Sequence, residues 1–261
     1  MKKSAHVFTA VIFALFLFLA KTGLTDERIV FFSSTLQNTL LELYTSDANP
    51  NGNLAVEWMR DLKKEEASQN VLWKRVIPIV MHVHLWDVPG YMDSFSLKEY
   101  DDRLLAYKKK WGAIKVYCPT MVVNGIEWAG WSKQQPIPLE TVATGELYVD
   151  GTKRDGFYQV EFKPAKSLNV KEFTVHAALI AFGLKSKPSE GKNRGKLLQH
   201  DFICRIHRTQ DLIPLSNGIS SATMELARPK ALSVQQYAVV FWVTKKGDPT
   251  PLQATGGYLP S

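Results

Sequence analysis

Cysteine is scarce in this sequence. Cys118 and Cys204 are the two cysteines among 261 residues, and they stand too far apart to form a C-x-x-C pair. They allow at most one disulfide, so the chain has no disulfide framework. A bridge between them would have to join the two halves of the chain, and we do not expect one.

Several common catalytic signatures are also missing. The sequence contains no G-x-S-x-G, no H-E-x-x-H and no P-loop motif. These absences remove the usual signs of serine hydrolases, zinc proteases and phosphate-binding enzymes. Internal repeats and low-complexity tracts are absent as well.

The N-terminus carries a long apolar run. Lys2 and Lys3 precede an uncharged stretch over residues 7–20. A basic start followed by about fourteen apolar residues is typical of a secretory signal and is short for a membrane-spanning helix. We predict that residues 1–25 are a signal peptide, or an N-terminal anchor if they are not cleaved, and that the protein is periplasmic or secreted.

Composition bounds the rest of the chain. With 45% hydrophobic and 22% charged residues, it is long enough for one large domain or two small ones. The formal net charge of +7 favours a basic soluble surface. Nucleic-acid binding is disfavoured, because no basic stripe is interleaved with aromatic residues.

The first half of the chain alternates strands and helices. Residues 40–44 read as a buried strand, 54–66 as a helix and 76–85 as a central strand with apolar residues throughout. A capping-box pattern at Ser96 opens a second helix that stops at Gly112.

A hairpin follows, and then the signals change. Asn124-Gly125 suits the two-residue turn of a hairpin between a strand that ends at Val123 and a strand over residues 126–129. After residue 140, short strands separated by turn residues predict a β-sandwich. The expected strands are residues 146–149, 157–162, 173–182, 197–207, 220–226, 235–243 and 252–258.

The order of elements in the first half resembles the thioredoxin fold. In that fold the proline before the hairpin is cis and lies beside the redox site, and Pro119 stands at this position. The resemblance implies an α/β thioredoxin-like N-terminal domain over residues 26–140, followed by an all-β sandwich-like C-terminal domain over residues 141–261.

Five short motifs make the resemblance more specific. "LELYTS", "HVHLWD", "YCPTMVVNG", "GKNRG" and "LLQHDF" occur in this order. Together they resemble a family of bacterial secreted proteins of unknown function, with a thioredoxin-like domain and a β-rich domain. The resemblance covers residues 40–258.

The family's redox positions hold no sulfur here. In the family, the segment after "TS" usually carries C-x-x-C, and alignment on Thr45 and Ser46 places Asn49 and Gly52 at the two cysteine positions. Thiol–disulfide exchange needs an attacking thiolate and a resolving thiol. Asn49, Gly52 and Pro119 therefore outline a vestigial redox site, and dithiol chemistry there is excluded.

Two hypotheses about function remain. The favoured one is a non-enzymatic binding or scaffold module of the cell envelope, without cofactor, whose partner is an unknown protein or an anionic envelope component. Its candidate binding edge is formed by Asp47, Asn51, His84, Trp86 and Asp87 beside Pro119, because parallel strands present their carboxyl ends on one edge. The alternative is an oxidoreductase relative that acts through the single thiol of Cys118.

The segment "TSDANPNGN" resembles the first half of a calcium-binding loop. Asp47, Asn49, Asn51 and Gly52 match the start of a calcium loop, but Trp58 stands where a bidentate glutamate is required. We therefore predict a turn that caps the following helix, with Asn51 or Asn53 as the N-cap.

Zinc binding was weighed for two histidines on one strand face. His82 and His84 are two residues apart, and Asp87 offers a third ligand. The expectation is instead that these are hydrogen-bonded structural residues and that the protein holds no metal. The basic loop over residues 185–196 is either a solvated loop or a contact for an anionic partner.

Overall fold

The apolar run that begins at Val76 forms an interior strand of an eight-stranded sheet. The computed structural model describes residues 27–260, apart from residues 70, 153–155 and 230–233. The strand order is β15 (Pro251–Tyr258), β14 (Gln236–Lys245), β8 (Phe173–Phe182), β11 (Ile203–Asp211), β3 (Val76–His82), β2 (Thr39–Thr45), β4 (Thr120–Val123) and β5 (Ile126–Glu127). β3 runs parallel to both of its neighbours, and the other pairs are antiparallel.

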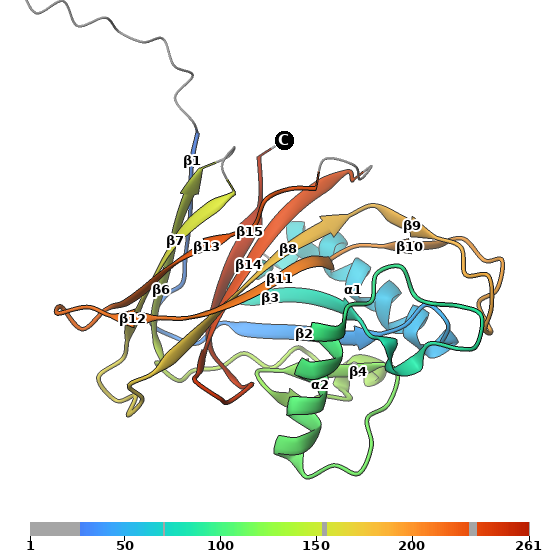
Figure 1. Ribbon diagram of the computed structural model, residues 1–261, viewed down its shortest axis with the longest axis horizontal. Helices are drawn as coiled ribbons and strands as arrows, with labels where there is room; N and C mark the ends of the chain where they lie inside the picture. Colours follow the sequence, from blue (N-terminus) through green and yellow to red (C-terminus); the bar gives the residue numbers. More distant parts are fainter. Residues whose placement is uncertain (1–26, 70, 153–155, 230–233, 261) are drawn as a thin grey trace, which may run out of the picture.

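Two α-helices flank the parallel strands. α1 (Pro50–Gln69) connects β2 to β3, and α2 (Lys98–Trp111) connects β3 to β4. Figure 1 shows α2 in front of the sheet and α1 behind it. The side chains of β2 alternate between these faces: Glu42 meets α2 through a hydrogen bond from Arg103, and Leu41 and Leu43 point to the other face and are fully buried.

The ends of the helices differ in part from the predictions. α1 begins at Pro50, and the side chain of Asn49 accepts a hydrogen bond from the Asn51 N–H. Asn49 is therefore the N-cap, and the prediction of Asn51 or Asn53 was wrong, because proline is well suited to the first helical position. α2 stops at Gly112 as predicted, with a left-handed φ of 64°.

The predicted capping box of α2 does not form. Ser96 Oγ donates to the Asp93 carbonyl 2.7 Å away and not to the helix. The N-cap position belongs to Leu97, whose side chain makes no capping hydrogen bond. A tertiary contact thus takes the hydroxyl that the sequence pattern assigns to the helix.

A second sheet packs on the far part of the first (Figure 1). Its order is β1 (Arg28–Phe32), β6 (Gly145–Thr152), β7 (Phe157–Pro164), β13 (Ser220–Glu225) and β12 (Ile213–Pro214). Alternate residues of β8 and β14 divide between two cores. Leu179 and Phe241 face this sheet, whereas Ile180 and Trp242 join the core shared with β2 and β3.

Several short elements lie at the end of the eight-stranded sheet that is farthest from the five-stranded sheet. β9 (Leu184–Ser186) and β10 (Leu198–His200) form a two-stranded ribbon. The 3-10 helix η1 (His84–Trp86) follows β3, and η2 (Gly130–Lys133) follows β5. The loop between β9 and β10 lies beside the loop that holds η1. Their proximity is shown at Gly90, where an added Cβ would be 3.4 Å from Glu190 Cγ.

The expected fold class was wrong. Strands make up 44% and helices 16% of the structure, with two α-helices and three sheets, which does not match an α/β thioredoxin-like N-terminal domain followed by an all-β sandwich. The strands β2 to β5 belong to the same sheet as β8, β11, β14 and β15. β3 is apolar on both faces. Without β11, β3 would be the exposed edge strand of its sheet, and pairing with β11 covers that edge. The division at residue 140 stays a prediction.

Most individual elements were predicted correctly. The helix over 54–66, the hairpin at Asn124-Gly125 and the strand over 173–182 are present. The strand expected over 197–207 is two strands, β10 and β11, because Phe202 between them has a φ of 61°. The N-terminal apolar run lies outside the described residues. Within those residues, neither α-helix has the length and apolar character needed to cross a membrane.

Candidate functional site

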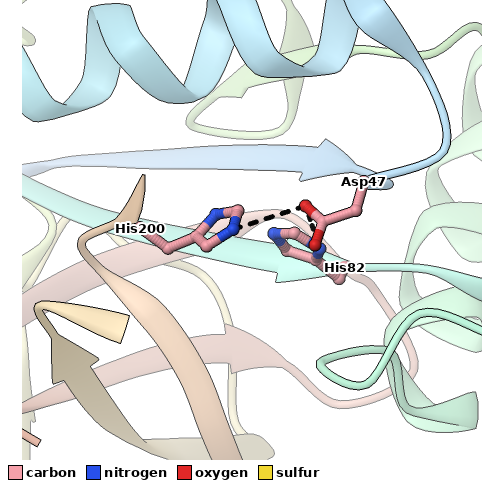
Figure 2. A group of neighbouring side chains, drawn as sticks. All are labelled: Asp47, His82 and His200. Carbon is pink, nitrogen blue, oxygen red and sulfur yellow. Dashed lines mark ion pairs between the residues drawn. The ribbon is translucent and has the colours of Figure 1, made fainter. Parts of the chain in front are cut away.

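Three side chains from separate strands converge beneath the β9–β10 ribbon. Asp47 follows β2, His82 ends β3 and His200 ends β10. Asp47 Oδ1 lies 3.5 Å from His200 Nε2 and 3.7 Å from His82 Nδ1. Figure 2 shows the carboxylate and the two rings pointing toward one another. The exposed fractions of the three side chains are 3% or less.

Asp93 fixes the orientation of His82. His82 Nδ1–H donates to Asp93 Oδ2 at 2.7 Å, and Asp93 Oδ2 also accepts the Asp47 N–H at 2.8 Å. The Phe95 N–H binds the other carboxylate oxygen. Asp93 therefore holds the imidazole and the backbone of the Asp47 loop in one arrangement.

Ser186 closes the group from the side of β9. Its hydroxyl donates to Asp47 Oδ2 at 2.5 Å and lies 2.9 Å from His200 Nε2. Asp47, His82, Asp93, Ser186 and His200 are called the Asp47 cluster below.

The basic loop covers this region. Asn193 Nδ2 donates to the backbone carbonyls of Asp47 and Asn49, and the loop approaches so closely that a Cβ on Gly191 would lie 2.9 Å from the Ala48 carbonyl oxygen. The five basic residues of the loop point outward and are exposed: Lys185, Lys187, Lys192, Arg194 and Lys196. The loop thus has a fixed inner side and a cationic outer side.

The buried charges in the cluster depend on one another. Burial disfavours the charged form of His82, but the charge and hydrogen bond of Asp93, together with the charge of Asp47, raise its pKa above the ordinary value. Burial opposes ionisation of Asp93, yet the charge and hydrogen bond of His82 lower its pKa to about 2. Each of the two groups therefore favours the charged form of the other.

The pKa shifts of Asp47 and His200 are opposite in direction to those of Asp93 and His82. Burial raises the pKa of Asp47, and the charge of Asp93 acts in the same direction, against the charge of His82 and the Ser186 hydrogen bond. Burial, together with the charge of His82, lowers the pKa of His200 to about 3. His200 is neutral at physiological pH, and burial disfavours the charged form of the Asp47 carboxyl.

One of the two positions that the resemblance aligns with cysteines, Gly52, lies near Cys118. A Cβ built on Gly52 would be 3.6 Å from Cys118 Sγ, and the Cys118-Pro119 bond is cis, as predicted. Asn49 serves as the helix N-cap. Cys118 and Cys204 are both free thiols, so the bridge that we did not expect is absent.

The predicted binding edge is only partly assembled. Asp47 is buried in the cluster, whereas Asn51 is exposed and Trp86 and Asp87 are partly buried. His84 turns away from His82, because β3 ends at His82 and a 3-10 helix begins at His84. His84 Nδ1 binds Asp101 Oδ2 at 3.1 Å. That these residues bind a partner stays a prediction.

Neither the calcium loop at Asp47 nor the zinc set of His82, His84 and Asp87 forms. The Asp47 carboxylate points into the cluster and the Asn49 side chain caps α1, so the loop is not arranged around calcium. His82 is joined by His200 and not by His84.

Sequence reasoning missed three cluster members: Asp93, Ser186 and His200. Asp93 lies in the loop after β3, Ser186 ends β9 and His200 ends β10, and no spacing rule connects them to Asp47 or His82. His200 did stand within the motif "LLQHDF", which was used for resemblance but not for chemistry.

Comparisons with known proteins give a family and a fold. A family model described as "Protein of unknown function (DUF1223)" matches residues 40–244. A solved structure of a protein from Agrobacterium tumefaciens is 18% identical, with a TM-score of 0.52, over 86% of this chain and 95% of that one. HBP35 of Porphyromonas gingivalis is 15% identical, with a TM-score of 0.58, over 87% of this chain and 76% of that one. No curated protein matches.

Proposed function

The chain belongs to the family of proteins of unknown function DUF1223, and we propose that this member is an exported binding protein that performs no thiol–disulfide exchange. In this proposal the ligand is held at the Asp47 cluster. The single observation that carries the proposal is a buried polar cluster in which His82 Nε2 and His200 Nδ1 have no hydrogen-bond partner among the described residues.

The thiol that lies nearest the vestigial redox site is chemically unsuited to redox work. Burial raises the pKa of Cys118 to about 12, so almost none of it is thiolate at neutral pH. Gly52 offers no resolving sulfur. These features disfavour the alternative hypothesis, in which Cys118 acts alone.

The cluster has capacity left for a ligand. His82 Nε2 and His200 Nδ1 are buried and have no hydrogen-bond partner among the described residues. Buried polar atoms are normally paired, and an unpaired one costs about 1–3 kcal/mol. A polar hollow of about 230 Å³, lined by His200, Arg60 and Gln199 among others, lies beside the cluster. A ligand that binds His82 Nε2 would remove this cost at one of the two nitrogens.

Two sequence features support export and an envelope location: the N-terminal apolar run and the basic loop. The apolar run over residues 7–20 follows two lysines, which is the form of a secretory signal. The five exposed cations of the basic loop favour an anionic neighbour.

Two measurements test the absence of redox function. Alkylation of Cys118 by iodoacetamide in the folded protein is expected to be slow at pH 7 and to rise only toward high pH, and a disulfide-reduction assay with a thiol reductant should give no catalysis. Rapid alkylation at neutral pH together with turnover would overturn this part of the proposal. Cys118→Ser is the control for the labelled site.

Binding and export are tested on the protein recovered from producing cells. Native mass spectrometry of wild type should show a non-covalent mass that His200→Gln loses and His84→Gln keeps. If the same non-covalently bound mass stays on wild type and on both variants after mild recovery, binding at the cluster is overturned. Full-length protein found only in the cytoplasm would overturn export.

A further inference from the structure

The donor atoms of the Asp47 cluster have the composition and spacing of a metal site. Ligand atoms of Asp47, His82 and His200 lie within 4.8 Å of one another. In a tetrahedral zinc site with bonds of about 2.0–2.1 Å, ligand atoms are about 3.3–3.4 Å apart. The 3.5 Å separation of Asp47 Oδ1 and His200 Nε2 is close to this value.

We propose that Asp47, His82 and His200 form a binding site for a divalent transition-metal ion such as Zn²⁺. This inference rests on the proposed function, because it names the ligand of the same cluster. The three ligands come from three strands, so the site exists only in the folded chain.

Asp93 gives His82 the arrangement that metal sites use. A histidine ligand commonly donates its second ring N–H to a carboxylate, which fixes the ring and makes the other nitrogen a better donor. His82 Nδ1–H binds Asp93 Oδ2 at 2.7 Å, and His82 Nε2 is buried with no partner in the described part of the chain. Nε2 is therefore the nitrogen offered to the ion.

His200 and Ser186 complete the surroundings. The neutral ring of His200 can present Nε2, which faces the Asp47 carboxylate. Ser186 Oγ lies between the two, 2.5 Å from Asp47 Oδ2 and 2.9 Å from His200 Nε2. Its hydroxyl either keeps its hydrogen bond to the carboxylate or becomes a fourth ligand.

The surrounding carboxylates also favour a dication. Asp47 and Asp93 are buried and lie within 3.7 Å of His82 Nδ1. As carboxylates they carry a combined charge of −2, which matches the charge of a divalent ion. Arg205 and Arg60 act on the two histidines from outside, and Tyr91 donates a hydrogen bond to Asp47.

The donor types select the class of ion. Imidazole nitrogens with a single carboxylate suit Zn²⁺, Co²⁺ and Ni²⁺, whereas Ca²⁺ and Mg²⁺ prefer oxygen ligands in larger number. His200 also lines the hollow next to the cluster.

The test uses the full mature chain, stripped with a chelator. Zinc binding is measured by calorimetry and by metal analysis after gel filtration, and Co²⁺ is added as a spectroscopic probe. We expect one Zn²⁺ per chain and the visible absorption of four-coordinate Co²⁺ with nitrogen and oxygen ligands. His200→Gln and Asp47→Asn should weaken binding at least about tenfold, and Asp93→Asn by about 10–100-fold. The matched control is His84→Gln, which removes a partly exposed histidine outside the cluster.

Measurements on wild type keep the test sharp if a variant fails to fold. Zn²⁺ should shift the imidazole resonances of His82 and His200 and leave those of His84 unchanged. The inference is overturned if wild type binds no zinc, if His84→Gln weakens binding as much as His200→Gln, or if the Co²⁺ spectrum shows a thiolate band. A non-metal mass at the cluster without zinc binding would overturn this inference and leave the proposed binding function standing.

Discussion

Arg103 Nε lies 2.7 Å from Glu42 Oε2 inside the protein, and both side chains are almost fully buried. A second contact joins Arg103 Nη2 to Glu42 Oε1 at 3.1 Å. The hydroxyls of Tyr44 and Tyr107 donate to the same carboxylate. This network fixes α2 on the face of β2, and the carboxylate accepts hydrogen bonds on both oxygens.

Breaking this pair from one side should be costly. Arg103→Met leaves the Glu42 carboxylate buried without its counter-ion, so we expect a loss of about 3–5 kcal/mol in the free energy of unfolding. The double variant Glu42→Gln with Arg103→Met should recover part of that loss. Urea denaturation measures both. Lys98→Met, which removes an exposed ion pair with Asp102, is the control and should leave the stability nearly unchanged, because water screens exposed ion pairs. An equal effect of Arg103→Met and Lys98→Met would contradict this account.

Gly52 should not tolerate a side chain. A Cβ at this position would overlap Thr45 Oγ1 and lie 2.9 Å from the Ser46 carbonyl oxygen. Gly52→Ala is expected to destabilise the fold by about 1–3 kcal/mol through overpacking, although alanine favours a helix. The comparison is Asn53→Ala, one residue further along α1, measured by thermal unfolding. A Gly52→Ala protein as stable as wild type would show that the contact relaxes freely.

Stability should fall as the solution becomes acidic. Burial lowers the pKa of His200 and His207 to about 3, and that of His176 well below its usual value. An unfolded histidine titrates near 6.5, so between about pH 6.5 and 3 the unfolded chain binds more protons. Each such histidine then costs on the order of 1.4 kcal/mol per pH unit. His82 acts in reverse: its raised pKa adds stability that is present below 6.5 and lost as pH rises through its folded pKa.

Urea titrations between about pH 5 and 7 measure this slope. The buried imidazole of His207 stacks with His176 and with Trp242, which also stack on each other, and His207→Gln should reduce the slope by about one proton. Stability that is constant or rises toward pH 5 would refute the neutral state of these three histidines.

Metal binding should release a proton. Burial opposes the charged ring, but Asp93 and Asp47 raise the pKa of His82, and a protonated ring must lose its proton before Nε2 binds Zn²⁺. Affinity should increase by about tenfold per pH unit below the folded pKa of His82 and become constant above it. Calorimetry in buffers of different ionisation enthalpy counts the proton. Affinity that is independent of pH would exclude His82 as the ligand, and His84→Gln should leave the pH dependence unchanged.

The local elements were accessible from the sequence because their signals are local. Alternation, helical spacing and Asn124-Gly125 predicted β8, α1 and the hairpin, and Gly112 predicted the end of α2. The fold class was not, because one pairing, β3 with β11, joins the halves of the chain into one sheet. A pairing between strands so distant in sequence leaves no periodic trace.

By itself the sequence determined that Asn49 and Gly52 carry no sulfur and that Cys118 precedes Pro119; the structure places Gly52 near Cys118 and makes the Cys118-Pro119 bond cis. Only the tertiary structure decided what surrounds Asp47. His200 and Ser186 reach it from a ribbon far along the chain, and Asp93 reaches it from the loop after β3. Hydrogen bonds and charge act over a few ångströms in space, and the fold, not the spacing of residues along the chain, sets those distances.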